Sequence, residues 1–293
     1  MDFLAEFEAK INLANQSLQK FFVKKENYQK TIYDAMEYSL FSGGKRIRPV
    51  LCGACAELFG GDIEEAMPFA CAVEMIHTYS LIHDDLPCMD DDDLRRGKPT
   101  SHIVYGEAMA VLAGDALLNC AFETALNFSK SSPAVTLEAL KVIATLSGTE
   151  GMIGGQVIDL ESEGTEIDTV TLMAMHICKT GALMMAAAKA GAIVGGGTKE
   201  DVLNMEKFAR YLGVAFQIKD DILDVESTTD ILGKPIGSDS ENEKTTFVTL
   251  YGLEQSKKML EDYTRMAIET LEPYGEQADF LRGLAEFLLQ RDR

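Results

Sequence analysis

A cluster of carboxylates directly after an apolar stretch is the feature that most constrains this chain. Six aspartates fall within residues 84–93, and Arg95, Arg96 and Lys98 follow at once. Without counter-charge these carboxylates would repel one another, and folding would raise their pKa values. Mg²⁺ holds carboxylates ionised and completes its coordination with water and substrate phosphate oxygens, while arginine forks suit phosphate. The stretch therefore predicts a metal-bridged phosphate substrate; the alternative is a solvated acidic loop.

A second acidic cluster argues against the solvated loop. Asp220, Asp221 and Asp224 lie inside an apolar, periodic stretch rather than between such stretches. Asp220 and Asp224 are four residues apart, so on a helix they share one face. Carboxylates on a core-facing helix are costly unless they meet a cation. Two clusters that both adjoin apolar helices favour a metal site.

Apolar residues recur at helical spacing through most of the chain, and strand signals are nearly absent. The clearest helix runs from about Glu64 to Asp84, and Pro87 should end it near Asp84 and Asp85 by disfavouring α geometry at Leu86. A further helix is expected to start near Pro49. The other expected helices are 3–22, 28–41, 105–129, 135–160, 169–193, 199–224, 246–272 and 276–290. The pattern predicts an all-α fold.

Two polar segments interrupt the helices. Gly43-Gly44-Lys45-Arg46-Ile47-Arg48-Pro49 combines a flexible turn with three cations that would complement a diphosphate; the alternative is a helix end with solvated charges. The polar stretch 226–245 is longer than most connections in a compact domain, which indicates a functional loop. It contains Lys234, and we expect it to be a mobile lid over bound phosphate. No shift in composition marks a boundary, so 1–293 is expected to form a single domain.

Charge and composition exclude several classes of protein. The net charge of −20 argues against nucleic acid or an anionic membrane as the main partner. No uninterrupted apolar run approaches the roughly 20 residues of a membrane span. The first residues lack the basic-then-apolar layout of a signal peptide, and the six cysteines are scattered through apolar stretches, which suits a reducing compartment. Cys52 and Cys55 are expected to be core residues rather than zinc ligands. We expect a cytoplasmic location.

The order of these motifs resembles the trans-isoprenyl diphosphate synthase family. Asp84-Asp85-x4-Asp90 precedes Arg95-Arg96-Gly97, and Asp220-Asp221-x2-Asp224 follows later, like the family's two aspartate-rich motifs. Further matching fragments are Gly43 to Pro49, Glu74-Met75-Ile76-His77, Ala113-Gly114-Asp115, Gly154-Gly155-Gln156, Lys179-Thr180-Gly181 and Gly233-Lys234-Pro235. Within the family the chain is most similar to bacterial farnesyl diphosphate synthases (geranyltranstransferases).

This resemblance implies an all-α bundle around a deep central cavity, usually as a homodimer. It implies a site for three Mg²⁺ ions, or Mn²⁺ in their place. Asp84, Asp90 and Asp220 would be direct ligands, and Asp85, Asp221 and Asp224 would act partly through water.

The resemblance also assigns the substrate contacts. Arg95, Lys179 and Lys234 would clamp the allylic diphosphate, and Thr180 and Gln217 would lie beside the developing allylic cation. Isopentenyl diphosphate would be held by Gly44, Lys45, Arg48, His77 and Arg96. The catalytic set is then Arg95, Lys179, Thr180 and Gln217. His83 is expected to be a packed or capping residue, and Gln156 and Asp159 stay outside the predicted site because they suit structural hydrogen bonding equally well.

The expected reaction joins isopentenyl diphosphate to dimethylallyl and geranyl diphosphate, by ionisation, condensation and deprotonation, to give farnesyl diphosphate. Tyr79 and Ser80 lie about one helical turn before Asp84, where a bulky ring should stop chain growth early. The alternatives are the same chemistry ending at geranyl or geranylgeranyl diphosphate, a terpene cyclase, or a non-catalytic subunit. A cyclase does not need the second diphosphate site that Lys45, Arg48 and Arg96 suggest, and an inactive subunit would be expected to lack one aspartate cluster. The role of Arg291-Asp292-Arg293 is left open.

Overall fold

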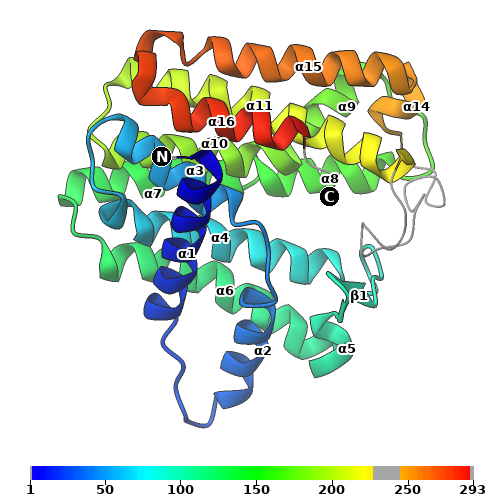
Figure 1. Cartoon of the computed structure of the whole chain (residues 1–293). Helices are drawn as coiled ribbons and strands as arrows, with labels where there is room; N and C mark the ends of the chain where they lie inside the picture. Colours follow the sequence, from blue (N-terminus) through cyan, green and yellow to red (C-terminus); the bar gives the residue numbers. More distant parts are fainter. Residues whose placement is uncertain (1, 227–244, 291–293) are drawn as a thin grey trace.

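The computed structural model describes residues 2–226 and 245–290, and over these residues the protein is a helical bundle, which confirms the all-α prediction (Figure 1). A π-helical turn, η1 (Ile177–Gly181), joins α9 to α10, and a 3₁₀ segment, η2 (Glu272–Ala278), precedes the last helix. One two-residue hairpin, β1 (Leu94–Arg95) with β2 (Lys98–Pro99), follows α4. The α-helices are α1 (Phe3–Phe21), α2 (Lys30–Leu40), α3 (Ile47–Leu58), α4 (Ile63–Asp84), α5 (Ser101–Tyr105), α6 (Glu107–Phe128), α7 (Pro133–Ser147), α8 (Met152–Ser162), α9 (Thr169–His176), α10 (Ala182–Val194), α11 (Lys199–Glu226), α14 (Phe247–Tyr251), α15 (Leu253–Glu269) and α16 (Asp279–Gln290).

Glycines divide two of the helices that the sequence predicts as continuous and set the start of a third. Gly106, at φ 83°, separates α5 from α6, and Gly252, at φ 77°, separates α14 from α15. These left-handed backbone angles are open to glycine at little cost and interrupt an α-helix. The expected helix 135–160 is broken between Gly148 and Gly151, which gives α7 and α8. The predictions of unbroken helices over 135–160 and 246–272 were therefore wrong, whereas the helix predicted over 105–129 is confirmed by α6.

Helix α10 lies at the centre of the bundle, in contact with α3, α4, α7 and α11 (Figure 1). It is rich in alanine and buried along nearly its whole length. A Cβ at Gly191 would lie only 2.1 Å from the carbonyl oxygen of Cys52, so the glycine lets α3 approach α10 closely. Cys52 and Cys55 are fully buried in this contact, and burial raises the pKa of Cys52 to about 12. Their prediction as core residues is confirmed.

Two helical stretches of the described chain, Glu107–Phe128 and Thr169–Val194, are long and apolar enough to cross a membrane by those criteria alone. Core helices of soluble proteins meet the same criteria, and the second stretch includes the central helix α10. These stretches are therefore weak evidence of membrane insertion, and the described residues show no clear membrane span.

A buried ion pair anchors the basic turn that precedes α3. Arg46 occupies the left-handed region at φ 52°, and its Nη1 lies 2.7 Å from Oε1 of Glu74 on α4. Its Nη2 donates to the Leu40 carbonyl at 2.8 Å, and its Nε donates to Oδ1 of Asn15 at 2.9 Å. Both charged side chains are 3% exposed, so the ion pair is removed from water. It fixes the turn that carries Lys45 and Arg48 against α4.

We expect Glu74→Ala to lower the free energy of unfolding by about 3–5 kcal/mol, because it leaves the buried Arg46 without its counter-charge. Urea unfolding followed by circular dichroism measures this loss. Arg265→Ala, which removes the exposed ion pair with Asp262, is the matched control and should have a much smaller effect. Equal losses in the two variants would show that the buried pair does not anchor the turn.

Candidate active site

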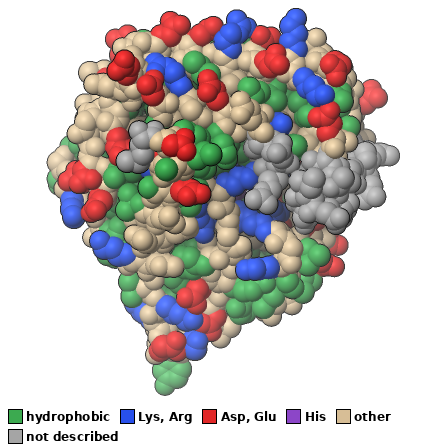
Figure 2. Space-filling view, viewed as in Figure 1, with side chains coloured by type: hydrophobic (Ala, Val, Ile, Leu, Met, Phe, Trp, Pro, Cys, Tyr) green, Lys and Arg blue, Asp and Glu red, His purple; other side chains and the backbone are tan. Residues whose placement is uncertain are grey.

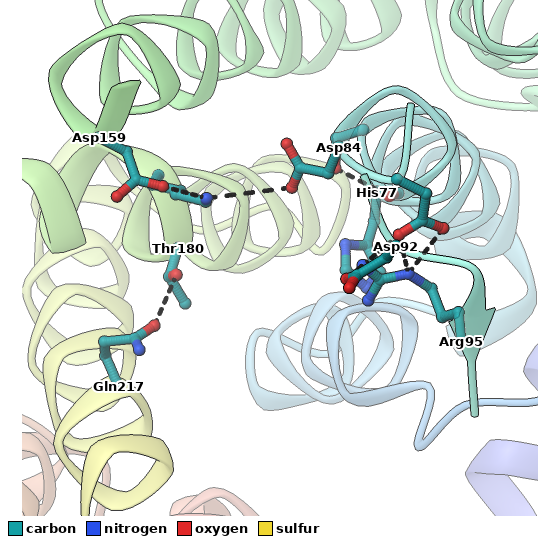
Figure 3. Close-up of polar contacts among 10 residues, drawn as sticks. His77, Asp84, Asp92, Arg95, Asp159, Thr180 and Gln217 are labelled. Atoms are coloured by element: carbon teal, nitrogen blue, oxygen red, sulfur yellow. Dashed lines mark hydrogen bonds and ion pairs between the residues drawn. The ribbon is translucent and has the colours of Figure 1, made fainter. Parts of the chain in front are cut away.

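The two acidic motifs lie at the ends of α4 and α11, which finish on the same side of the bundle (right in Figure 1). Asp84 is the last residue of α4 and Asp85 its C-cap, as the sequence predicts. Asp220 is half-buried on α11, one helical turn before the buried Asp224. The amino group of Lys179 lies 4.0 Å from Oδ2 of Asp84, and the same side chain lines a smaller pocket with Asp221 (Figure 3). Lys179 therefore stands between the two motifs.

Lys179 and Thr180 project from the π-helical turn η1. Such turns interrupt the regular i→i−4 ladder and often occur at functional sites. Gly155 on α8 makes room for this turn, since a Cβ there would lie 2.1 Å from the backbone nitrogen of Lys179. The close approach brings Asp159 on α8 to 2.6 Å from the Lys179 amino group (Figure 3). Burial opposes the charge of Lys179, but Asp84 and Asp159 outweigh it and raise the pKa of the lysine.

A chain of hydrogen bonds joins Thr180 to the second acidic motif. The Thr180 hydroxyl donates to Oε1 of Gln217 at 3.1 Å (Figure 3). The Gln217 amide donates to Oδ1 of Asp221 at 3.1 Å, and the Phe247 backbone N–H donates to Oδ2 at 2.8 Å. Both carboxylate oxygens of Asp221 are therefore held by neutral donors, which fixes the orientation of Gln217 and Thr180 at the cavity edge.

The hairpin after α4 presents Arg95 to the first acidic motif. Arg96 and Gly97 form its two-residue turn with positive φ values of 54° and 73°, as a type I′ turn requires. Nε of Arg95 lies 2.7 and 2.9 Å from the two oxygens of Asp85, and its Nη2 donates to Oδ1 at 2.5 Å. Figure 3 shows the Arg95 side chain directed toward the end of α4. The backbone N–H of Asp90 donates to the Asp84 carbonyl at 2.9 Å, so the loop folds back over the end of α4.

A separate group of basic residues lies on the α3 side of the cavity. Arg48 and His77 line the cavity, and Lys45, three residues before Arg48, is exposed. Gly44 adopts φ 131°, and a Cβ there would lie 2.9 Å from Nη1 of Arg96, which also donates to the preceding carbonyl. Burial lowers the pKa of His77 well below its usual value, and Arg48 and Arg96 add to the effect, so this imidazole is neutral at pH 7. Burial likewise lowers the pKa of Arg48, although Glu74 and Asp220 oppose the shift.

A cavity of about 350 Å³ extends inward from these charges. Figure 2 shows Lys and Arg side chains gathered in a hollow near the middle of the molecular face. Tyr79 and Ser80 line the cavity, as predicted, and α8 supplies much of its apolar wall. The volume is near the lower end of the roughly 300–1,000 Å³ of small-molecule sites. The apolar wall residues are Met152, Ile153, Val157, Leu160 and Leu183.

The carboxylates fit a cation that arrives together with a phosphate. Among residues 2–226 and 245–290, no group of three His, Cys, Asp or Glu side chains is placed to hold an ion by itself. Burial raises the pKa of Asp84 to about 6, and Asp90 and Asp159 add to the effect while Lys179 and Arg95 oppose it. Mg²⁺ typically needs only one or two protein carboxylates if phosphate oxygens complete its shell. The donor set is therefore suited to Mg²⁺ bridged to a substrate.

Some predicted residues lie outside the part of the chain that the structure describes. This group comprises Lys234, residues 227–244 of the expected lid, and Arg291–Arg293.

Two residues left outside the predicted site lie in it: Gln156 lines the cavity, and Asp159 pairs with Lys179. Asp159 contacts the predicted catalytic lysine directly, although 20 residues separate the two in the chain. A lone carboxylate on an amphipathic helix carries no distinguishing signal, because the close approach at Gly155 that brings it to Lys179 is tertiary.

Comparison with known proteins identifies the family. The family model described as polyprenyl synthetase matches residues 29–274. The chain belongs to this family. The chain is thus a prenyltransferase of the isoprenyl diphosphate synthase type, in agreement with the resemblance of its motifs.

Relatives and solved structures match most of the chain. It is 49% identical over 276 residues to the heterodimeric geranylgeranyl pyrophosphate synthase large subunit 1, chloroplastic, of Arabidopsis thaliana, covering 92% of this chain and 74% of that protein. It is also 49% identical over 265 residues to the geranylgeranyl diphosphate synthase of Cyanophora paradoxa, covering 89% and 88%. The apo crystal structure of an FPP/GFPP synthase from Zymomonas mobilis matches with a TM-score of 0.88 and 37% identity, covering 98% and 99%.

The raised pKa of Asp84 gives a test by pH. Between about pH 4 and 6 the folded, metal-free protein binds a proton at Asp84 more tightly than the unfolded chain, so its stability falls as pH rises through this window. We expect Asp84→Asn to raise the free energy of unfolding at pH 7 by roughly 1–3 kcal/mol and to change it little near pH 4. Urea unfolding of EDTA-treated protein from pH 4 to 8 measures this. A difference that does not depend on pH would show that burial of the charged carboxylate is not its cause.

Asp159→Asn tests whether the carboxylate holds Lys179 in place. The variant keeps the volume of the side chain and removes its charge, so we expect turnover to fall by up to about a hundredfold through misplacement of the lysine. Steady-state kinetics with an allylic and a homoallylic diphosphate measure this. Glu206→Gln, which removes the charge of another partly buried lysine partner, should leave turnover unchanged. Equal losses in both variants would show that Asp159 acts only on stability.

Proposed function

We propose that this chain is a Mg²⁺-dependent prenyltransferase that condenses isopentenyl diphosphate with allylic diphosphates and ends at geranylgeranyl diphosphate. The observation that carries the proposal is the position of Lys179 between two aspartate motifs, at the mouth of an apolar cavity. The proposed metal ligands are Asp84, Asp85, Asp90, Asp220, Asp221 and Asp224.

The first step breaks the C–O bond of the allylic diphosphate, which builds negative charge on the leaving group. Arg95, paired with Asp85, and Lys179, beside Asp84, would stabilise that charge electrostatically. Mg²⁺ held by the two motifs would supply Lewis-acid neutralisation of the same diphosphate. Water would quench the allylic cation, so the apolar wall on α8 has to exclude water from the cavity. The Thr180 hydroxyl and the Gln217 carbonyl oxygen would face the cation from the cavity edge.

The second substrate needs a separate anion site. Lys45, Arg48 and Arg96 would bind the diphosphate of isopentenyl diphosphate, with Gly44 allowing close approach and neutral His77 donating a hydrogen bond. The alkene then attacks the allylic cation, and loss of a proton to the departing diphosphate completes the cycle. A cyclase uses one diphosphate substrate and has no need of this second set of cations.

The end product is the finer part of the proposal. Two relatives at 49% identity are named geranylgeranyl diphosphate synthases, and this supports a twenty-carbon product in place of the farnesyl diphosphate expected from Tyr79. Farnesyl diphosphate is the second candidate, because the Tyr79 ring stands in the wall of a cavity of only about 350 Å³. The Zymomonas structure, named as an FPP/GFPP synthase, shows that this fold accompanies other product lengths as well.

Assembly and location complete the proposal. We propose a homodimer, since α6 leaves Val111, Leu112 and Leu126 exposed, an apolar face that a second copy would cover. We also propose that 1–293 acts as one domain, that Lys234 is a substrate-binding residue, and that the protein is cytoplasmic. The Arabidopsis relative is named as chloroplastic, which is a property of that protein.

A product assay tests the proposed function. Purified protein receives Mg²⁺, isopentenyl diphosphate and, in separate reactions, a five-, ten- or fifteen-carbon allylic diphosphate, and mass spectrometry reads the chain length. We expect a twenty-carbon product from all three starters and complete loss of condensation in excess EDTA.

The other outcomes are equally informative. Products that stop at fifteen carbons would support the mechanism and would indicate that Tyr79 limits the product to farnesyl diphosphate. Release of diphosphate from the allylic substrate alone would indicate a cyclase. No turnover in any mixture would indicate a non-catalytic subunit and would refute the proposal.

A further inference from the structure

His83 lies where the cavity wall meets α6, and the mechanism gives it no part. Its ring lines the cavity together with Tyr79 and Asp84. Its Nε2 lies 3.0 Å from the backbone carbonyl oxygen of Val111 on α6. A carbonyl can only accept, so the ring carries a proton on Nε2 and donates it to α6. The imidazole is thereby fixed to the neighbouring helix rather than free to turn into the cavity.

Helix α6 carries a glycine, Gly114, at the point where the His83 ring packs against it. A Cβ at Gly114 would lie 2.1 Å from Nε2 of His83 and 2.5 Å from Cδ2. No side chain can occupy this position while the ring stays where it is, because real Cβ contacts are never so short. Gly114 therefore forms a seat for the imidazole on α6.

The other side of the imidazole faces Tyr79, one helical turn earlier on α4. The two rings meet edge to face, with centroids 5.6 Å apart and an interplanar angle of 76°. The Tyr79 hydroxyl is buried and makes no hydrogen bond to any residue in 2–226 or 245–290. Packing alone therefore sets the position of the tyrosine ring, and the imidazole is its neighbour toward the cavity mouth. Ser80, by contrast, is held by its own helix, since its hydroxyl donates to the His77 carbonyl at 2.9 Å.

We propose that His83, seated on Gly114, is a positioning residue that braces Tyr79 and so sets the chain length at which the cavity is full. This inference rests on the proposed chain-elongation activity, and adds that product length depends on a contact between α4 and α6 as well as on the tyrosine itself. Removal of the brace frees the Tyr79 ring to move toward α6 and lets a longer chain pass. A side chain in place of Gly114 pushes the imidazole toward the cavity and shortens the space for the growing chain.

Two single variants should shift the product in opposite directions. His83→Ala should raise the ratio of the next longer product to the wild-type product by roughly tenfold or more. Space for one or two carbons in an apolar pocket changes discrimination between substrates by about that factor. Gly114→Ala should lower the share of the longest product and raise the share of the product that is shorter by one five-carbon unit. The double variant His83→Ala, Gly114→Ala should behave like His83→Ala, because the added methyl group then meets no ring. Tyr79→Ala should lengthen the product, and adding His83→Ala to it should change little.

Mass spectrometry of products from isopentenyl diphosphate and the three allylic starters measures all of these shifts, with total turnover recorded beside them. His102→Ala, which removes a buried imidazole away from the cavity, is the control and should keep the wild-type product length. Loss of turnover without the opposite shifts would assign His83 to stability alone and overturn the inference. Should His83→Ala fail to fold, Gly114→Ala decides: a shift to shorter products supports the brace, and an unchanged product length overturns it.

Unchanged product length in active His83→Ala, together with longer products from Tyr79→Ala, would overturn the brace and leave the proposed function standing. Absence of elongation by the wild-type protein would refute the proposed function itself, and the inference with it.

Discussion

The ion pair between Lys179 and Asp159 is the interaction on which the arrangement of the site depends. A lysine set among apolar helices needs an anion, and Asp159 supplies one at 2.6 Å before any substrate is present. The pair ties the π-helical turn that carries Lys179 and Thr180 to α8, which forms the cavity wall. Because Asp84 stands 4.0 Å away on the other side, the lysine is also directed toward the first acidic motif. Substrate diphosphate would enter a site whose central cation is already in position.

Close helix contacts make that ion pair possible. The glycines at positions 155 and 213 lie where α8 and α11 approach the η1 segment, and a Cβ at either would meet backbone atoms within 2.8 Å. Larger side chains would separate these helices and move Asp159 and Gln217 away from Lys179 and Thr180. Gly155 and Gly213 are therefore steric requirements of the site.

Much of the architecture follows from the sequence, and the remainder depends on tertiary contacts. Pro87 places the end of α4 at Asp84 because it acts on the residue directly before it, and the spacing of Asp220 and Asp224 is local in the same way. In the sequence Arg46 is one of three similar cations, yet the structure buries it against Glu74, a partner 28 residues away. The hairpin at Arg95 was not expected, since two-residue strands carry no periodic signal. The link between His83 and α6 is equally invisible in the sequence, because a glycine in a helix does not reveal which side chain fills its place.

Helix α8 has two tasks in this protein, and they lie on the same eleven residues. Ile153, Val157 and Leu160 shape the depth of the cavity, while Asp159 holds the charge at its mouth. A rigid helix cannot shift one of these groups along its axis and leave the other in place. Evolution toward a new chain length through α8 would therefore be accompanied by a change in rate, and α4, which carries both Tyr79 and Asp84, has the same constraint. Helix α6 carries Gly114 and none of the proposed ligands, so it offers a route that leaves the lysine undisturbed. Lineages that diversify their products would then be expected to vary α6 more freely than α8.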